Sequence, residues 1–359
     1  MSNIGGVFQV DQAEFIEQAR QFQLEGQTIA VVKNNAYNYG LDFAVKAFAI
    51  SGIDYFATTS IEDAIYIRKI CGEKVSIFLL NPTTDFKRVK KYKLEITLPS
   101  LDYYQTYKND LVGLAIHIEF EGLFKRSGLA HIDQLAAILR DAKDSGSTLN
   151  IKGLWTHFGY ADEFNGIYEK ERQLWLDFVE GVFDLGLKPS VIHAQNSASF
   201  VRDGIFKSHS HVRLGIGLYG SKPFKNLDDK DFIQASSVTA PIIQIRHLDK
   251  GMSLGYSGAF TAEEDCKIAI VDIGYGDGIL RERIKHGCQI GGRTYKIVAL
   301  MMSHMAVLID DHVEAHMPVY LYGKNQRIDH FTALGVGANS EQLGALNYNS
   351  MRRDIVYDD

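Results

Sequence analysis

One lysine near the start of the chain has the type and the setting for covalent chemistry. Residues 28–32 are apolar and rich in β-branched side chains, which predicts a strand buried on both faces, and Lys33 follows this run directly. In a parallel α/β protein the C-terminal ends of the strands carry the functional site, and a lysine in a partly dry pocket can form a Schiff base with a carbonyl compound. The alternative is a lysine whose stem packs against the protein while its ammonium group reaches solvent.

Other polar residues follow later apolar runs. They are Arg126 after the fifth run, His157 at the end of the sixth, Asn196 and Ser197 after the seventh, and Gly215 and Ile216 at the eighth. Taken alone, His157 would more often be a core residue and Ser197 more often a helix cap. If the runs are strands of one closed parallel sheet, their C-terminal ends converge on one mouth, and these residues then form one site with Lys33.

Residues 215–220 match the pattern GxGxxG, which in other settings binds a dinucleotide. That function requires a helix directly after the glycines, whereas the proline-containing segment 221–224 follows here. Barrels commonly bind a phosphate through backbone N–H groups of the loops after strands seven and eight, so we expect Ser197 and Ile216 to hold one phosphate. A phosphate there and a Schiff-base lysine on strand one correspond to the two ends of pyridoxal 5'-phosphate.

The elements that must position these residues alternate in type. Segments of helical period, at 43–50, 134–142 and 171–185, lie between the apolar runs. Eight strand-helix units are the signature of a (β/α)8 barrel of the TIM type. The eight runs are 28–33, 55–59, 75–80, 95–98, 114–120, 151–158, 191–194 and 212–218.

The pattern changes after residue 220. Strands linked by turns, with little helical period, are predicted at 240–245, 267–271, 295–300 and 319–322. We therefore expect a barrel domain over residues 12–228, followed by a mainly β domain over 229–359. Residues 1–11 are open to packing with that second domain.

Bulk composition excludes several classes of protein. The 359 residues carry a net charge of -6 and no basic run with interleaved aromatics, so nucleic acid is not an expected partner. Cys71, Cys266 and Cys288 match neither a disulfide framework nor a CxxC spacing, which favours a reducing compartment. No segment reaches about 18 consecutive apolar residues, and the N-terminus lacks the pattern of a signal peptide. We expect a cytoplasmic protein with no membrane contact.

Several blocks together resemble alanine racemases of the pyridoxal-phosphate barrel type. Residues 33–37 (KNNAY) resemble the cofactor-lysine motif of this family, K-A-[ND]-A-Y-G-H-G. Further blocks occur in the order of the family and cover nearly the whole chain. They are 155–158 (WTHF), 193–197 (HAQNS), 213–216 (RLGI), 254–262 (LGYSGAFTA) and 274–278 (GYGDG).

The resemblance implies two acid/base groups, Lys33 and Tyr256, because racemisation removes a proton from one face of the substrate Cα and delivers one to the other. Lys33 would also carry the cofactor, and the functional unit would be a homodimer in which Tyr256 of the partner subunit completes each site. A chain from Tyr256 to His157 to Arg213 is implied, with Arg213 facing the pyridine nitrogen. A guanidinium has no acceptor, so that nitrogen would stay unprotonated.

Further roles are implied for residues around these groups. Tyr37 and Tyr348 would contact the phosphate, and Tyr348 would also limit the side-chain pocket. Arg126 would bind the substrate carboxylate, which the backbone N–H of Met302 could also meet. His193 and Tyr275, in the matched blocks, would support the site.

Two blocks depart from the family pattern. Residues 118–128 align with L-K-[VL]-D-T-G-M-G-R-L-G, and of the family residues only Arg126 and Gly128 remain. Glu119 falls where the family often has a carbamylated lysine, and our hypothesis is that Glu119 supplies that negative charge directly. The alternative is a solvated edge residue. In residues 301–305, Ser303 replaces an aspartate of the family pattern C-M-D-Q.

These patterns predict an enzyme that interconverts L-alanine and D-alanine and supplies D-alanine for cell-wall synthesis. One alternative is a racemase of serine or of a broader set of amino acids. Another is a non-catalytic pyridoxal-phosphate-binding protein, against which the β domain argues because such proteins resemble only the barrel. A metal hydrolase is the weakest alternative: His209 and His211 alternate like ligands but precede strand eight, at the opposite face, so we expect no metal.

Overall fold

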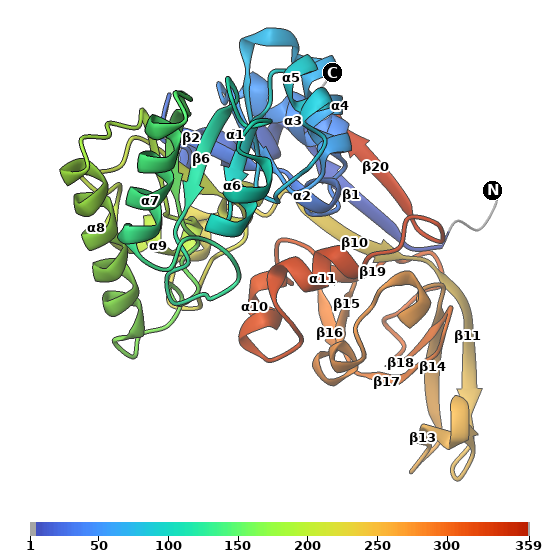
Figure 1. Ribbon diagram of the computed structural model, residues 1–359. Helices are drawn as coiled ribbons and strands as arrows, with labels where there is room; N and C mark the ends of the chain where they lie inside the picture. Colours follow the sequence, from blue (N-terminus) through green and yellow to red (C-terminus); the bar gives the residue numbers. More distant parts are fainter. Residues whose placement is uncertain (1–4, 358–359) are drawn as a thin grey trace. The chain divides into compact units, whose positions relative to one another are not determined.

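The computed structural model describes residues 5–357, which fall into two units (Figure 1). Arg20–Leu218 form the first, which we call the barrel unit. The N-terminal segment up to Ala19 and the chain from Tyr219 onward form the second, which we call the β unit. The domain limits expected at residues 12 and 228 stay a prediction.

Eight parallel strands form the sheet of the barrel unit, in the order β8-β7-β6-β5-β4-β3-β2-β9. The two end strands meet where the Arg213 N–H donates to the Gln195 carbonyl oxygen at 2.8 Å. The predicted eight-stranded barrel is therefore confirmed. Its strands are β2 (Thr28–Val31), β3 (Tyr55–Thr58), β4 (Ser76–Leu79), β5 (Glu95–Leu98), β6 (Ala115–Glu119), β7 (Asn150–Trp155), β8 (Val191–His193) and β9 (Val212–Leu214).

Several strands end earlier than the apolar runs that predict them. β9 ends at Leu214 because Ile216–Tyr219 form a 3₁₀ helix, η2. β7 ends at Trp155, so His157 lies in the loop beyond the strand rather than on it. These residues leave the sheet at its C-terminal edge, where their side chains are available to a site.

Helices connect the strands and lie around the sheet in Figure 1. The segments predicted as helical at 43–50, 134–142 and 171–185 overlap α3, α7 and α8. The helices of this unit are α2 (Lys33–Tyr37), α3 (Leu41–Ile50), α4 (Ile61–Cys71), η1 (Gly72–Lys74), α5 (Phe86–Lys91), α6 (Leu101–Tyr107), α7 (Ile132–Asp144), α8 (Ile167–Asp184) and α9 (Ser197–Asp203). Helix α1 (Gln12–Phe22) begins in the β unit and ends in the barrel unit.

The short helix α2 is a left-handed turn made of residues with side chains. Asn34, Asn35 and Ala36 each have φ of 53°, and Tyr37 and Asn38 follow with φ of 50° and 72°. A left-handed helix costs roughly 1–2 kcal/mol per residue, least for Asn, whose short side chain hydrogen-bonds locally. Asn35 does so, because its Oδ1 accepts the Leu41 N–H at 2.9 Å. The turn carries the chain away from β2 directly after Lys33.

The β unit contains three antiparallel or mixed sheets. Six strands pair in the order β16-β15-β19-β10-β1-β20, four in the order β11-β14-β18-β17, and β12 pairs with β13. The strands are β1 (Val7–Asp11), β10 (Ser236–Ala240), β11 (Ile242–Leu248), β12 (Ser253–Leu254), β13 (Phe260–Thr261), β14 (Cys266–Val271), β15 (Cys288–Ile290), β16 (Arg293–Tyr295), β17 (Ile297–Leu300), β18 (Met305–Ile309), β19 (Val319–Tyr322) and β20 (Arg352–Val356).

The mainly β second domain predicted from the sequence is confirmed, with two corrections. The segments 240–245 and 295–300 are each divided between two strands, at Pro241 and Lys296, rather than forming one strand each. Proline lacks the N–H group that a strand interior needs, which explains the first break. The remaining helices are η3 (Asp229–Asp231), η4 (Tyr256–Gly258), η5 (Tyr275–Asp277), η6 (Arg281–His286), α10 (Ile328–Ala333) and α11 (Asn339–Ala345).

Among residues 5–357, no helix has the length and the apolar character that crossing a bilayer requires.

Candidate active site

Lys33 lies just beyond the C-terminal end of β2 and is mostly buried. Burial lowers the pKa of its amine below the ordinary 10.5, and the positive charges of Arg126 and Arg213 lower it further. A lowered pKa leaves more of the amine neutral at physiological pH, and only the neutral amine can attack a carbonyl or accept a proton.

Arg213, on β9, is buried and makes four hydrogen bonds within the barrel unit. Nη1 donates to Nδ1 and to the carbonyl oxygen of His193, at 3.0 and 3.2 Å. Nη2 donates to the Thr156 carbonyl oxygen at 2.9 Å and to His157 Nδ1 at 3.3 Å. Burial and then the charge of Arg126 lower the pKa of Arg213 to about 10, so the guanidinium stays charged at neutral pH.

The fifth N–H group of Arg213 remains for another partner. A guanidinium carries five N–H donors and no acceptor. Across residues 5–357, none of the hydrogen bonds of Arg213 involves its Nε–H group. One donor of a side chain that is only 3% exposed is thus left for an occupant of the barrel mouth.

His157 is held as a neutral ring with a defined tautomer. Its Nδ1 can only accept from Arg213, so the proton of the neutral ring lies on Nε2. Burial lowers the pKa of His157 well below 6.5, and the charges of Arg213, Arg126 and Lys33 act in the same direction. Phe124 packs edge-on against the ring, with centroids 5.1 Å apart.

The loops after β8 and β9 gather donors suited to a phosphate. The N–H groups of Gly215 and Gly217 both point at Ser197 Oγ, at 3.3 and 3.1 Å. The Tyr37 ring packs against Gly215, where a Cβ would lie 2.5 Å from Tyr37 Oη, so the approach requires glycine. Burial raises the pKa of Tyr37 to about 12, which keeps its hydroxyl protonated.

Asn196 has a structural role in the same region. Its Oδ1 accepts the Ser199 N–H at 3.1 Å and caps α9, while its Nδ2 donates to the Phe158 carbonyl oxygen at 2.9 Å. Ile216 is the first residue of η2. The cap fixes where α9 begins and therefore where Ser197 lies.

Glu119, the last residue of β6, is the acidic group next to Arg126. Its carboxylate lies 3.9 Å from Arg126 Nη2, and Thr97 Oγ1 donates to it at 3.5 Å. Glu119 is 3% exposed, which contradicts the alternative of a solvated edge residue. Burial raises its pKa above 4.5, while a hydrogen bond from Ser127 and the charges of Arg126 and Arg213 oppose that rise.

The charges in the mouth fit pyridoxal 5'-phosphate. Arg126 and Arg213 lie close enough to Lys33 for their charges to lower its pKa, and Arg126 also lowers the pKa of Arg213, which Glu119 raises. The two guanidinium groups of Arg126 and Arg213 against one carboxylate leave an excess of positive charge, which suits an anionic occupant. The backbone donors at Gly215 and Gly217 suit its phosphate, and the mostly buried amine of Lys33 suits its aldehyde.

Four predicted site residues belong to the β unit. Tyr256 opens the turn η4 between β12 and β13, and its side chain is 65% exposed. Met302 is also exposed and lies in the loop after β17. Carbonyl oxygens of this loop, that of Met302 included, accept the backbone N–H groups of Tyr275 and of the residue after it. The Tyr348 ring packs against Phe8, with centroids 6.1 Å apart. The barrel unit thus brings together the cofactor-side residues, and the β unit carries this second group.

Groups of metal-ligating type are occupied by other partners. Within the described part of the chain, one group of three such side chains lies together, Asp229, Asp329 and His330. Lys222 and Arg327 form ion pairs with these carboxylates, so the arrangement is a charge-balanced network. His209 and His211 bond to Trp175 and Ser210, at 2.7 and 2.8 Å.

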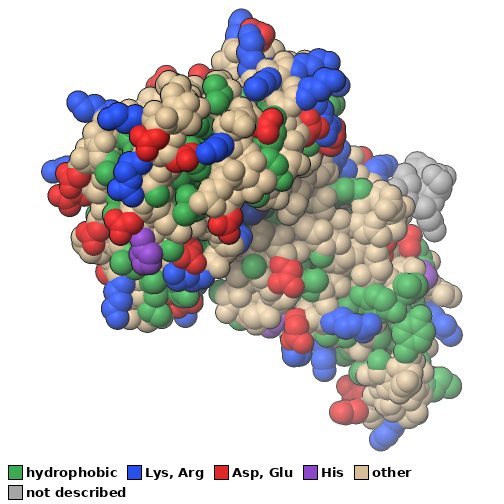
Figure 2. Space-filling model, viewed as in Figure 1, with side chains coloured by type: hydrophobic (Ala, Val, Ile, Leu, Met, Phe, Trp, Pro, Cys, Tyr) green, Lys and Arg blue, Asp and Glu red, His purple; other side chains and the backbone are tan. Residues whose placement is uncertain are grey.

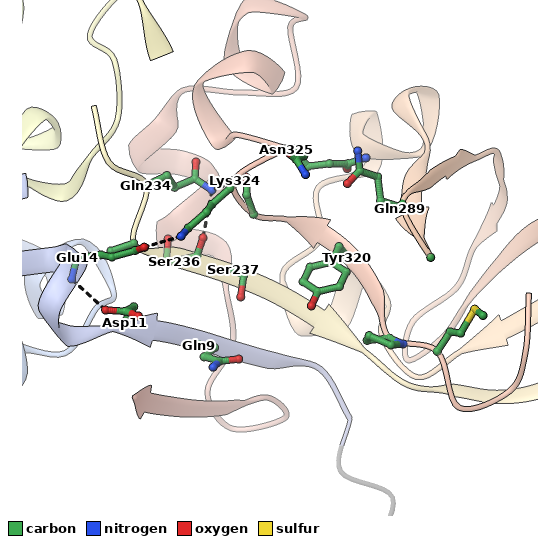
Figure 3. A pocket seen from close by; sticks show the side chains of 17 residues that line it. Gln9, Asp11, Glu14, Gln234, Ser236, Ser237, Gln289, Tyr320, Lys324 and Asn325 are labelled. Atoms are coloured by element: carbon green, nitrogen blue, oxygen red, sulfur yellow. Dashed lines mark hydrogen bonds and ion pairs between the residues drawn. The ribbon is translucent and has the colours of Figure 1, made fainter. Parts of the chain in front are cut away.

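A cavity of about 570 Å³ lies on the six-stranded sheet of the β unit (Figure 3). Gln9, Ser237 and Tyr320 line it from neighbouring strands, and Lys324 forms an ion pair with Glu14 at one end. Side-chain amides and hydroxyls, Gln234 and Ser236 among them, line part of it. None of the predicted site residues lines this cavity.

Two buried polar residues that are connected to Arg213 through His193 were not predicted from the sequence. Glu95 opens β5 and His117 lies within β6, and both are buried inside the barrel. The only signal was a charged or ionisable residue within a run predicted to be buried on both faces.

Comparison with known proteins shows which family has this arrangement. Family models described as the N-terminal and C-terminal domains of alanine racemase match residues 12–223 and 235–353. Alanine racemase 2 of Staphylococcus aureus is 46% identical over 355 residues, covering 98% of each chain. An alanine racemase of Staphylococcus epidermidis is 27% identical over 340 residues, covering 91% of this chain and 86% of its own.

Solved structures agree in fold. The crystal structure of alanine racemase from Bacillus anthracis with bound L-Ala-P has a TM-score of 0.86 and 21% identity, covering 99% of this chain and 96% of its own. Alanine racemase from Streptomyces coelicolor has a TM-score of 0.87 and 19% identity, covering 99% and 98%. Together with the family models and the curated relatives, these matches lead to one conclusion: the chain belongs to the alanine racemase family.

Proposed function

We propose that this protein interconverts L-alanine and D-alanine with pyridoxal 5'-phosphate as its cofactor. The observation that carries the proposal is the convergence of Lys33, His157 and Arg213 at one barrel mouth, in a chain of the alanine racemase family. Lys33 would attach the cofactor, Arg213 would face its ring nitrogen, and Ser197, Tyr37 and the glycine loop would hold its phosphate. When bound, the cofactor withdraws electrons from the substrate and makes its Cα proton acidic.

The residues of the chain would divide the proton transfers between two faces. The amine of Lys33, whose pKa burial lowers, accepts or donates the Cα proton on one face. Tyr256 of the partner subunit does so on the other. Arg213 cannot give a proton to the ring nitrogen, because its guanidinium stays charged and donates only. Withholding that proton limits side reactions that need a long-lived anion.

The surface of the β unit supports a homodimer with shared sites. Figure 2 shows hydrophobic side chains gathered on the visible face of this unit around β11 and β14. Ile243, Met252, Tyr256 and Met302 are large hydrophobic side chains exposed on the same unit. Exposed apolar side chains of this kind mark interaction surfaces. A second copy of the chain would cover them and receive Tyr256.

Arg126 would bind the substrate carboxylate. Its side chain is half exposed and extends from the loop after β6, while buried Glu119 lies behind it at 3.9 Å. The neighbouring anion would hold the guanidinium in the orientation that a carboxylate needs. Tyr348 and the Met302 loop would bound the substrate side chain.

The test is racemisation of L-alanine by the wild type and by Tyr256→Phe, each with its cofactor. Circular dichroism follows the change of the alanine enantiomer. We expect the wild type to be active and the variant to lose activity at least 100-fold, as for removal of a general acid or base. The cofactor absorbance band should persist in both. If the wild type binds the cofactor, leaves L-alanine unchanged and racemises serine, then serine and not alanine is the substrate.

The cellular role that we propose is the supply of D-alanine for cell-wall synthesis in the cytoplasm. The relatives described above come from bacteria, which supports it. The gene should allow a bacterial strain that lacks alanine racemase to grow without added D-alanine, and the Lys33→Ala variant should not. Growth with Lys33→Ala, or failure of the wild type, would contradict this role.

A further inference from the structure

A chain of hydrogen bonds runs from Arg213 through the interior of the barrel. Arg213 Nη1 lies 3.0 Å from His193 Nδ1, and His193 Nε2 lies 3.0 Å from His117 Nδ1. His117 Nε2 in turn lies 2.8 Å from Glu95 Oε2. Two imidazoles thus connect a buried guanidinium with a buried carboxylate.

The two ends of this chain demand the same direction for every proton, because Arg213 can only donate and the ionised carboxylate of Glu95 can only accept. Arg213 can only donate, so His193 Nδ1 accepts and the proton of the neutral His193 ring lies on Nε2. That N–H donates to His117 Nδ1, and His117 then carries its proton on Nε2 and donates to Glu95. Burial lowers the pKa of His117 below 6.5 and that of His193 well below it, so both rings stay neutral.

The chain crosses the barrel from one end to the other. Glu95 is the first residue of β5 and its partner Tyr55 is the first of β3, so both lie at the N-terminal ends of their strands. His193 and Arg213 lie at the last and middle positions of β8 and β9, nearer the mouth. The N-terminal ends face away from the mouth of a parallel barrel.

The interior is shaped to enclose the two imidazoles. The Phe78 ring stacks on His117 with centroids 4.4 Å apart and meets His193 edge-on at 5.3 Å. Trp155 lies parallel to His193 at 6.3 Å. Gly153 provides the space for His117, because a Cβ there would lie 2.1 Å from its Nδ1. An enclosed chain of hydrogen bonds in a dry interior is stronger than the same bonds in water.

We propose that Glu95 is a positioning residue of the active site: it fixes the tautomers of His117 and His193, and through them the orientation of Arg213 at the cofactor ring. This proposal rests on the proposed function only for the last step, the contact of Arg213 with the cofactor. A carboxylate that hydrogen-bonds an imidazole selects its tautomer in the same way in hydrolase triads.

Each charged or titratable group that faces Glu95 either favours the ionised form of its carboxylate or does not oppose it. Burial alone would raise the pKa of Glu95, but the hydrogen bond from His117 and the charge and hydrogen bond of Lys152 oppose burial, and the pKa of Glu95 is lowered. Tyr55 donates to the same carboxylate and keeps its proton, since burial and Glu95 raise its pKa. His211 packs edge-on against Tyr55. The negative charge of Glu95 acts to raise the pKa of Arg68.

Lys152 makes a sharp variant possible, because it donates to the second oxygen of Glu95. In Glu95→Gln the amide oxygen must face Lys152, because the ammonium group of Lys152 donates hydrogen bonds and cannot accept one. The amide NH₂ group then faces His117 Nε2. His117 would turn to the Nδ1–H tautomer, His193 would follow, and two N–H groups would oppose each other at Arg213. In the double variant Glu95→Gln/Lys152→Met the amide oxygen is free to face His117 again. Lys152→Met alone keeps the carboxylate.

The experiment is nitrogen NMR of the imidazole rings in the protein without cofactor, from pH 6 to 8. In the wild type and in Lys152→Met we expect His117 and His193 as Nε2–H tautomers at every pH. In Glu95→Gln we expect both as Nδ1–H tautomers, and in the double variant the wild-type pattern. An Nδ1–H tautomer of either ring in the wild type overturns the proposal, even where Glu95→Gln does not fold.

The loaded enzyme gives the second readout. Glu95→Gln should lower kcat about tenfold, as expected when a group that orients an active-site residue is lost, with the KM for alanine within about twofold and the cofactor absorbance band displaced. The double variant should regain most of kcat. Tautomers that change while kcat and the absorbance band do not would overturn the positioning role. A wild type with the expected tautomers and no racemase activity would contradict the proposed function and leave the tautomer assignment standing.

Discussion

Lys33, Arg126 and Arg213 bring three cationic side chains to the barrel mouth, where Glu119 is the nearby anion. A buried carboxylate next to one of these cations stabilises it and fixes its direction. We propose that Glu119 takes the place of the carbamylated lysine that the family often has at this position, and that it needs no bound carbon dioxide.

Replacing this acid should weaken substrate binding. Glu119→Gln should raise the KM for alanine about threefold to fivefold, or about 1 kcal/mol, because Arg126 is half exposed and its pair with Glu119 is long. Steady-state kinetics at pH 8 checks this. Glu121→Gln, which removes a neighbouring carboxylate paired with Lys125, is the control and should leave KM unchanged. An unchanged KM in Glu119→Gln would refute the role of Glu119.

The same residue gives the binding of alanine a pH dependence. Burial raises the pKa of Glu119 above 4.5, so it takes up a proton at a higher pH than an ordinary glutamate. Its charge, and the orientation of Arg126, are present above that pKa and lost as the pH falls through it. The KM of the wild type should therefore rise towards acid pH more steeply than the KM of Glu119→Gln, which has no such proton to gain.

Some residues of the site could be predicted because they lie at the ends of predicted strands. Lys33, Arg126 and His157 follow or lie on apolar runs, and their positions at one mouth require only the order of the strands. Arg213 was expected only from the resemblance to the family. Glu95 and His117 were not predictable, because the contact between His117 and His193 joins residues 76 positions apart and depends on which side chains point inward.

At the scale of elements, the left-handed turn α2 is where backbone strain is stored next to the site. Asn34 and Asn35 stand at φ of 53° with exposed side chains, so the sequence places there the residue type that tolerates this conformation. The two asparagines were a signal, yet five consecutive residues with positive φ contradict local propensity and could not be predicted. The eight strands could be, since each is a short apolar run.

Asn34 allows the strain to be measured. Asn34→Val should destabilise the protein by about 1–2 kcal/mol, because a β-branched side chain is opposed by sterics at positive φ. Asn34→Gly should change the stability by less than about 1 kcal/mol, since glycine adopts this conformation freely. Urea unfolding of the protein without cofactor gives both values. Equal midpoints for the two variants would show that the turn is not left-handed.

At the scale of the whole molecule, buried ionisable groups make stability depend on pH. Burial lowers the pKa of His157 and His193 well below 6.5, so they are neutral when folded and take up protons when unfolded. Their contribution is present above pH 6.5 and lost as the pH falls below it. Glu95, whose pKa is lowered from 4.5 to about 2, adds a contribution that is present above 4.5 and lost between 4.5 and 2.

The contributions of the histidines and of Glu95 are both lost as the pH falls, so the melting temperature should fall steadily from pH 7 towards pH 4. The lowered pKa of Glu95 means that its ionised carboxylate stabilises the folded protein at neutral pH. Glu95→Gln should thus melt lower at pH 7 and lose less stability than the wild type between pH 4.5 and pH 3. Differential scanning calorimetry checks this. A wild type equally stable at pH 4 and pH 7 would contradict neutral buried histidines.

The central claim is that each active site joins Lys33 of one protomer with Tyr256 of the partner subunit. The most direct measurement mixes Lys33→Ala with Tyr256→Phe, co-expressed with different tags so that heterodimers form. Each variant alone should be inactive. Half of the dimers should be mixed, and each mixed dimer has one site with both residues intact, so about a quarter of the wild-type activity should return. A mixture as inactive as its two components, with mixed dimers isolated by their tags, would contradict the claim.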